Sequence, residues 1–373
     1  MKLVVFGLTV SSSWGNGHAT LWRGLCRALA RRGHTVVFFE RDVPYYRSAR
    51  DLFALEAGRL VFYESWDSVR EEAEAELADA DVAMVTSYCP DGVAATDLVA
   101  ASRSLRRIFY DLDTPVTLAS IASGEPPAYI GERGLTDFDL VLSFTGGRAL
   151  SLLQERLGAR RVAPLYGHVD PQVHHATTPS ERYRGDLSYL ATYSADRAAA
   201  VDELFVRPAL AAPKLRFVLG GAMYPEPEAF PENLVHHPHV PPGEHAEFFC
   251  SSRLTLNVTR KTMAELGFCP SGRLFEAAAC GIPIVSDWFA GLDLFFEPDS
   301  EILVARDRHD VLAALSLPAE ELVQIGQRAR ARVLTEHTAH HRALTLESLL
   351  ADPEAVAAPR SMRVASDPLG AGR

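Results

Sequence analysis

The sequence predicts an α/β protein with two Rossmann-like, doubly wound domains that face a cleft between them. At 373 residues the chain is longer than one ordinary hydrophobic core needs, which indicates two domains. Short apolar runs alternate with amphipathic helical segments, as in a parallel sheet covered on both faces. The same strand, loop and helix unit opens both halves of the chain. We therefore predict domains at residues 1–167 and 187–350, a linker at 168–186 and a disordered tail at 351–373.

The first half opens on a continuous apolar run, which is typical of a strand buried on both faces. The predicted strands are residues 3–8, 36–39, 60–63, 82–86, 108–110 and 140–144. Helical periodicity covers residues 20–32, 68–77 and 148–157. This alternation predicts a doubly wound domain.

In the second half, prolines and polar residues first interrupt the apolar pattern, which predicts the linker. Strands are then expected at 187–191, 215–219, 254–258, 282–285 and 302–304. Helices are expected at 197–205, 244–250, 311–315, 320–335 and 340–350. Because open α/β sheets bind ligands beyond the carboxyl ends of their strands, both domains can direct those ends at one cleft.

Composition limits the class of protein. The net charge of −11 argues against a general nucleic-acid or anionic-membrane binder, which would need a basic face. No stretch approaches the ~18 apolar residues that span a bilayer, and the apolar N-terminus reads as a strand, not as a signal peptide. The five cysteines show no CxxC spacing, so we expect reduced thiols in a cytoplasmic protein.

The most informative stretch is residues 271–281, where small residues open a helix that carries one carboxylate. The unpaired N–H groups of Ser271, Gly272 and Arg273 form a ready anion site at the helix N-terminus. Glu276, one turn later, can accept hydrogen bonds from the vicinal hydroxyls of a ribose. Together these features predict a nucleotide site. The alternative is an ordinary amphipathic helix with Glu276 on its solvated side.

The loop after the first strand is a second candidate. Gly15 and Gly17 allow the backbone to approach a ligand closely, with Asn16 between them. His18, at the start of the next helix, can act as a base or bind a phosphate or hydroxyl, or it can simply cap the helix. A dinucleotide fingerprint would need glycine where Thr20 stands, which disfavours NAD.

Two acidic residues, Asp111 and Asp113, follow the strand at 108–110. Their spacing suggests a metal site, but no third acidic ligand is nearby, so we predict none. One carboxylate can instead bind a sugar hydroxyl at the cleft, or Asp113 can cap the helix that begins near Pro115. The histidines at 236, 237 and 239 are interrupted by a proline and predict a loop lining the base pocket more than a zinc site.

Two arginines of the second half are placed to bind a diphosphate. Arg197 lies in the first turn of the first helix there, and Arg260 follows the strand at 254–258. A guanidinium at either position can grip a diphosphate through paired hydrogen bonds and stabilise it as it departs. Either arginine can also be an ordinary surface residue.

Taken together, these motifs resemble the GT-B glycosyltransferases of group 1 (family 4-like), and among them the bacterial CgeB-like spore maturation proteins. The resemblance runs from residue 1 to about 350. It is carried by residues 12–18, 40–44, 110–115, 143–147, 256–260, 271–281 and 286–288. Several separated motifs in the right order are more specific than any one of them.

The resemblance implies a hexosyltransferase that moves a sugar from a UDP- or GDP-type donor to an acceptor in the cleft. It implies retention of configuration, no cofactor and no required metal. The C-terminal domain would bind the donor, with Glu276 on the ribose, Arg197 and Arg260 on the diphosphate, and the turn at 271–273 supplying N–H groups. The N-terminal domain would face the sugar and the acceptor through the residues His18, Asp111 and Asp113.

The sequence departs from the family at one position. The family usually carries two glutamates with seven residues between them, but Phe268 stands at the first position and the nearest carboxylate is Glu265. The exact sugar, the stereochemistry and the acceptor (a small molecule, a glycan or a protein) therefore stay open. So do a nucleotide-sugar epimerase of the same fold and a non-catalytic sugar- or nucleotide-binding assembly protein; a dehydrogenase is disfavoured.

Overall fold

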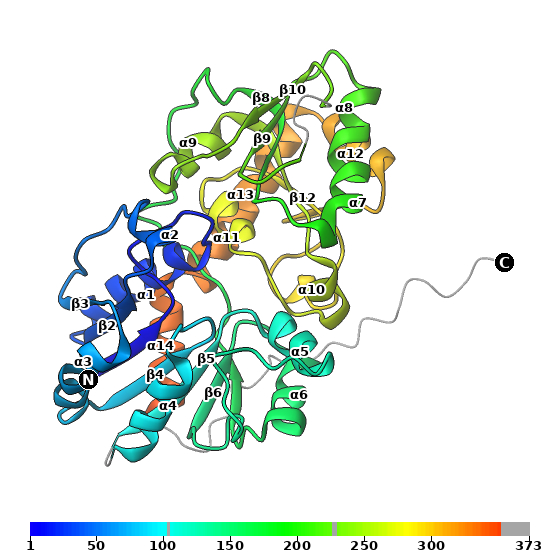
Figure 1. The fold of residues 1–373 in the computed structure, drawn as a ribbon. Helices are drawn as coiled ribbons and strands as arrows, with labels where there is room; N and C mark the ends of the chain where they lie inside the picture. Colours follow the sequence, from blue (N-terminus) through cyan, green and yellow to red (C-terminus); the bar gives the residue numbers. More distant parts are fainter. Residues whose placement is uncertain (103–104, 226–229, 352–373) are drawn as a thin grey trace.

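The computed structural model describes residues 1–102, 105–225 and 230–351 and contains two parallel sheets, each flanked by helices (Figure 1). The first sheet has the strand order β3-β2-β1-β4-β5-β6-β7, and the second has the order β10-β9-β8-β11-β12-β13. The predicted pair of doubly wound α/β units is confirmed. The predicted tail lies, except for Ala351, outside the described residues.

The first sheet forms the lower lobe of Figure 1. Its strands are β1 (Lys2–Gly7), β2 (Thr35–Arg41), β3 (Gly58–Tyr63), β4 (Val82–Thr86), β5 (Arg106–Asp111), β6 (Leu140–Ser143) and β7 (Val162–Pro164). The helices between them are α1 (His18–Arg31), α2 (Pro44–Arg47), α3 (Trp66–Leu77), α4 (Gly92–Ala101), α5 (Thr114–Ala122) and α6 (Arg148–Leu157). The sequence pattern did not predict α2, α4 and β7.

The second sheet forms the upper lobe. Its strands are β8 (Gly185–Leu190), β9 (Phe217–Gly220), β10 (Leu234–His237), β11 (Ser252–Asn257), β12 (Ile284–Ser286) and β13 (Leu303–Val304). Its helices include α9 (His245–Cys250), α10 (Lys261–Leu266), α11 (Gly272–Ala279), α12 (Arg308–Leu315) and α13 (Ala319–Glu336). The helix expected at 197–205 is a chain of shorter turns: a 3-10 turn (Ala195–Arg197), α7 (Ala198–Val201), a π-helical turn (Asp202–Val206) and α8 (Arg207–Ala211).

Strand β1 shows why continuous apolar runs become central strands. Val4 and Phe6 belong to the core on one face of the sheet, while Leu3 and Val5 belong to the core on the other. Because side chains alternate along a strand, burial on both faces requires apolar residues at every position. Apolar side chains therefore cover both faces of the first sheet, and functional side chains lie in the loops at the ends of its strands.

The C-terminal helix α14 (Ala339–Ala351) corrects the predicted domain boundary. Its residues Ala343, Leu346 and Leu349 are buried in the core of the first sheet, beside Leu25 and Leu29 of α1. Residues 339–351 therefore belong to the N-terminal domain, although the second domain was predicted to run to residue 350. Helical periodicity shows that a helix has an apolar face but not which sheet covers it.

The chain crosses between the domains twice, and the two crossings pack together. Val169 pairs with Thr338 in an isolated bridge, and the buried Arg342 donates to the backbone carbonyls of Tyr166 and Gly167 at 3.0 Å each. The predicted linker is thus a packed segment from which β8 begins at Gly185. Among the described residues, no helix is long and apolar enough to cross a membrane.

Candidate functional site

Charged residues from the two domains meet between the carboxyl ends of the sheets. Asp113, at the start of α5, lies 3.6 Å (Oδ2 to Nη1) from Arg260, which follows β11. Arg260 also pairs through Nε with Oδ2 of Asp196 at 3.2 Å, in the loop after β8. The structure therefore brings together two of the predicted site residues across the domain boundary.

An aromatic and an imidazole complete the N-terminal side of this cluster. Tyr88 donates its hydroxyl to Asp113 Oδ2 at 2.8 Å, and its ring stacks on that of His18 with centroids 6.4 Å apart. Burial lowers the pKa of His18, against the opposing effect of the Asp113 charge, and so favours the neutral imidazole. Tyr88 was missed by the sequence analysis, although it lies just beyond the carboxyl end of β4.

The carboxylates Asp111 and Asp113 have different surroundings. Asp111 is fully buried, and its Oδ1 accepts from the backbone N–H of Asp113 and the hydroxyl of Thr117, both at 3.1 Å. Burial raises the pKa of Asp111 to about 6. The buried Asp111 therefore positions Asp113, and its expected contact with sugar or acceptor stays a prediction. Asp113 begins α5, yet its side chain makes no capping hydrogen bond within the described residues.

The first loop is held by internal hydrogen bonds. Asn16 is buried; its Oδ1 accepts from the N–H of His18 at 3.1 Å, and its Nδ2 donates to the carbonyl of Thr9 at 3.2 Å. Asn16 therefore shapes the loop, and donor binding by Gly15, Asn16 and Gly17 stays a prediction. Gly15 adopts a φ of +60°, which favours glycine, and both it and Gly17 are exposed.

Glu40 anchors the same loop from the end of β2. Its carboxylate is fully buried and accepts from the hydroxyl of Thr9 and the backbone N–H of Val10, both at 2.8 Å, and from the N–H of Ser11 at 3.0 Å. From the sequence, Glu40 was noted only as part of the motif at residues 40–44. The sequence does carry a sign of its role, since this carboxylate interrupts an otherwise apolar strand.

Helix α11 places Glu276 inside the protein. Glu276 is 9% exposed, which excludes the solvated-face alternative. A Cβ on Gly272 would lie 3.9 Å from Glu276 Oε1, so the carboxylate borders the first turn of the helix. Ser271 makes no side-chain capping bond among the described residues. The N-terminal N–H groups and the carboxylate therefore share one small region, as predicted.

The two remaining arginines differ in their contacts. Arg273 donates from Nε to the carbonyl of Leu190 and from Nη1 to Asn257 Oδ1 at 2.7 Å, so it joins the ends of β8 and β11. Two nitrogens of the Arg273 guanidinium thus bind these strand ends, and donor binding by Arg273 stays a prediction. Arg197 donates from Nη2 to the carbonyl of Thr192, and its buried Nε has no hydrogen-bond partner among the described residues.

The three histidines of the predicted loop have different surroundings. His236 and His237 lie in β10, and His236 Nε2 contacts the carbonyl of Gly221 at 2.8 Å. The ring of His237 packs on Tyr183, while His239 packs on Trp14 of the other domain with centroids 4.7 Å apart. The three rings point to different partners and do not share a metal position.

Phe268 stands at the position where the family usually carries the first of its two glutamates. Here it contacts both domains. Its carbonyl accepts from the N–H of Gly146 at 2.9 Å, and its ring lies where a Cβ on Gly147 or Gly291 would clash, at 2.3 and 2.4 Å. Glu265 is exposed on α10 and pairs with Lys261 at 4.0 Å. The loop at this position therefore interlocks the domains through backbone and aromatic contacts.

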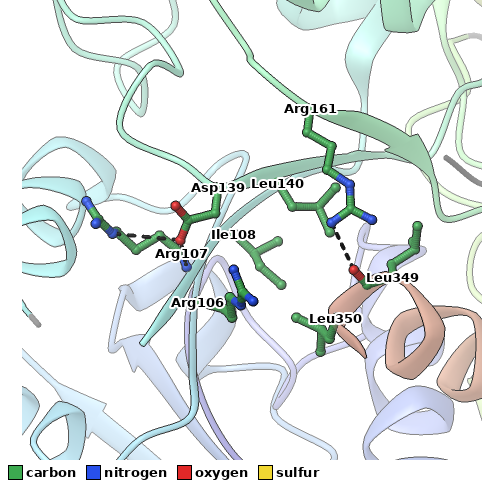
Figure 2. Close-up of a pocket in the computed structure, with 8 residues that line it drawn as sticks. All are labelled: Arg106, Arg107, Ile108, Asp139, Leu140, Arg161, Leu349 and Leu350. Carbon is green, nitrogen blue, oxygen red and sulfur yellow. Dashed lines mark hydrogen bonds and ion pairs between the residues drawn. The ribbon is translucent and has the colours of Figure 1, made fainter. Parts of the chain in front are cut away.

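A small pocket of about 40 Å³ lies at the opposite end of the first sheet (Figure 2). Its lining residues are Arg106, Arg107, Ile108, Asp139, Leu140, Arg161, Leu349 and Leu350. The arginines sit at the amino ends of β5 and β7, and Arg161 donates to the Leu349 carbonyl at 2.9 Å. Since ligands of such sheets bind at the carboxyl ends, this pocket is not the candidate site.

Comparison with known proteins agrees with the geometry. Residues 197–348 match a family described as glycosyl transferase-like. Curated protein sequences give no match.

Several solved structures share the fold across most of the chain. Sucrose-phosphate synthase from Thermosynechococcus elongatus aligns with a TM-score of 0.67 at 13% identity, covering 94% of this chain and 98% of its own. Anabaena HepE in complex with UDP and glucose gives 0.62 at 12% identity, with 94% and 99% covered. An alpha-glucosyltransferase in complex with UDP gives 0.68 at 13% identity, with 94% and 100% covered. The chain therefore has the GT-B fold, and its residues 197–348 match a glycosyl transferase-like family.

Proposed function

We propose that this protein transfers a hexosyl group from a UDP-sugar to an acceptor bound between the two domains. The observation that carries the proposal is the contact of Asp113 with Arg260, which joins an acidic group of one domain to a basic group of the other. A transferase needs this combination, because charge grows on the departing diphosphate while the acceptor must lose a proton. UDP is favoured because similar structures were solved with UDP, with UDP and glucose, or with UDP-glucose.

The donor is proposed to lie against α11. Glu276 accepts hydrogen bonds from the ribose hydroxyls, while the N–H groups of Ser271 and Gly272 and the guanidinium of Arg197 meet the diphosphate. Arg260 exchanges its contacts with Asp113 and Asp196 for the diphosphate when the donor binds. This exchange frees Asp113 to contact the sugar or the acceptor.

Acid–base chemistry is assigned to the cluster of His18 and Asp113. The neutral imidazole of His18 can accept a proton, and Tyr88 and Asp111 hold Asp113 in place. We propose that two arginines and a helix N-terminus neutralise the leaving diphosphate, so that transfer requires no metal. Retention of configuration follows from the resemblance, and NMR of the product anomer tests it.

Two finer assignments rest on the sequence. The motifs at 12–18 and 110–115 favour the CgeB-like branch of the family. The cysteines among the described residues are free thiols, which favours a cytoplasmic location.

A nucleotide panel tests the donor. Thermal unfolding is followed with UDP, GDP, dTDP, ADP and NAD; a ligand at ~100 times its dissociation constant adds ~2.7 kcal/mol of stability. We expect UDP to raise the melting temperature most. Stabilisation by NAD alone, or by none of the five, overturns the proposal, and a larger effect of GDP changes the donor class.

The role of Arg260 is tested by kinetics of UDP release from UDP-glucose. Arg260→Ala should lower kcat and kcat/KM together, because the contact strengthens as the diphosphate departs. Arg207→Ala, on α8, is the matched control, since Arg207 is exposed and pairs only locally with Asp202 and Glu203. A raised KM with unchanged kcat reduces Arg260 to a binding residue.

A further inference from the structure

Three buried or half-buried side chains converge beside α11 from separate parts of the chain. His174 comes from the segment between the two sheets, His245 opens α9, and Glu276 lies in α11; α9 and α11 pack together (Figure 1). One nitrogen from each imidazole and one carboxylate oxygen all lie within 4.8 Å of one another. His174 Nε2 is 3.9 Å from Glu276 Oε1.

Ring nitrogens of both histidines lack hydrogen-bond partners among the described residues. His174 is 3% exposed, and neither of its ring nitrogens has a hydrogen-bond partner among the described residues. His245 contacts the carbonyl of Val240 through Nε2 at 3.2 Å, so Nε2 carries the proton and the lone pair remains on Nδ1. Buried polar nitrogens without partners are costly, which calls for a ligand that accepts their lone pairs.

The backbone of His174 is held through Asp170. Its N–H donates to the carbonyl of Asp170 at 2.9 Å, and the Asp170 carboxylate accepts from Arg27 Nε of α1 at 2.7 Å. The imidazole of His245 is oriented by the Val240 carbonyl, which contacts Nε2. A histidine whose second ring nitrogen is held by a carbonyl, as in His245, is typical of metal centres.

We propose that His174, His245 and Glu276 form a binding site for a divalent transition-metal ion of the Zn²⁺ class. Two neutral imidazoles and one carboxylate are a set that zinc uses with a fourth, open position. Ligand atoms of tetrahedral zinc are about 3.3 Å apart when each lies about 2.0–2.1 Å from the metal. The three candidate ligand atoms lie within 4.8 Å of one another, and one pair is 3.9 Å apart, so the side chains must move closer together for ligation.

The site has a consequence that rests on the proposed function. Glu276 is also the residue assigned to the ribose, so bound Zn²⁺ and UDP compete for one carboxylate. Zinc at this site thus inhibits donor binding and plays no part in transfer.

The test uses the untagged full-length protein and Zn²⁺ as the probe. Competition with a chromophoric chelator measures zinc affinity for the parent and for the variants His174→Ala, His245→Ala and His340→Ala. His340 is the control, because it is exposed on α14. We expect one zinc per chain, a loss of at least about tenfold in affinity for each of the first two variants, and no change for His340→Ala. Equal affinity of all four proteins, or no binding by the parent, overturns the proposal.

Two further measurements separate the possible failures. Co²⁺ in place of Zn²⁺ should give the visible absorption of a four-coordinate site in the parent but not in His174→Gln, a variant that retains a polar side chain; absorption retained by the variant overturns the assignment. UDP affinity is measured with and without Zn²⁺. Zinc binding without any UDP binding overturns the proposed donor alone, whereas UDP and Zn²⁺ bound together overturn the shared use of Glu276.

Discussion

At the residue scale, the site consists of groups whose charges are held by specific neighbours. Asp113 and Arg260 neutralise each other across the domain boundary, and Asp196 provides a second carboxylate for Arg260. In the proposed mechanism, the donor diphosphate replaces these carboxylates. Burial and pairing therefore set how each group responds to substitution and to pH.

Glu276→Gln tests the ribose assignment. The change should weaken UDP binding by ~1.5–3 kcal/mol, the range for a hydrogen bond that involves a charged group. Isothermal titration with UDP measures the loss, and circular dichroism checks the fold. Glu265→Gln is the control, since Glu265 is exposed on α10 and should leave the affinity unchanged. Equal affinity of Glu276→Gln and the parent would remove Glu276 from the nucleotide site.

Ionisation of the Asp111 carboxyl makes the free energy of unfolding depend on pH. Burial raises its pKa from 3.8 to about 6. Between these values the folded protein keeps a proton that the unfolded chain has lost, so the free energy of unfolding falls as the pH rises. Asp111→Asn keeps the acceptor oxygen and removes the ionisation. From pH 4 to pH 7, its stability relative to the parent should increase by about 2–3 kcal/mol. Urea unfolding at both values measures the change; a constant difference contradicts the prediction.

At the element scale, α14 determines how the two domains are joined. The chain completes the second sheet and then returns to cover the first with Ala343, Leu346 and Leu349. Cutting the chain between the sheets would thus remove a covering helix from the N-terminal domain. We therefore expect substitutions in the buried face of α14 to destabilise the N-terminal domain.

Leu346→Ala tests this expectation. Leu346 is fully buried in the core of the first sheet, so its truncation should cost about 2–5 kcal/mol of unfolding free energy. Leu344→Ala on the same helix is the control, because Leu344 is 39% exposed and its loss should cost well under 1 kcal/mol. Denaturant unfolding compares the two. Equal losses would mean that α14 contributes little through its buried face.

At the scale of the whole molecule, the two sheets direct their carboxyl ends at a shared boundary. Trp14 packs on His239 across it, and the carbonyl of Phe268 accepts from Gly146. The charged contacts lie beside these apolar and backbone contacts. In the proposed mechanism, one side of this boundary supplies basic groups and a helix N-terminus for the diphosphate, and the other side supplies acid–base groups.

Removal of metal tests whether these protein groups suffice. EDTA should leave the rate of sugar transfer unchanged, because Arg197, Arg260 and the α11 N-terminus neutralise the leaving group in the proposed mechanism. The rate of UDP release from UDP-glucose is measured before and after chelation. Loss of activity in EDTA that manganese or magnesium restores would refute the metal-free mechanism.

The sequence by itself determined the fold class and pointed to several residues of the candidate site. Apolar runs buried on both faces, as in β1, predict parallel strands, and strand ends locate Asp113, Arg260 and the turn before Glu276. These signals are local, since each depends on the period of side chains along one element and on the residues that follow it.

Only the tertiary structure decided which elements meet. It placed α14 on the first sheet, buried Asp111 beneath Asp113, committed Arg273 to two strand ends and brought His174 and His245 to Glu276. None of these follows from a local pattern, because an apolar face or a polar side chain fits many partners of the same chemistry. The choice among them is made by the packing of residues far apart in the sequence, where burial and hydrogen-bond geometry are satisfied together.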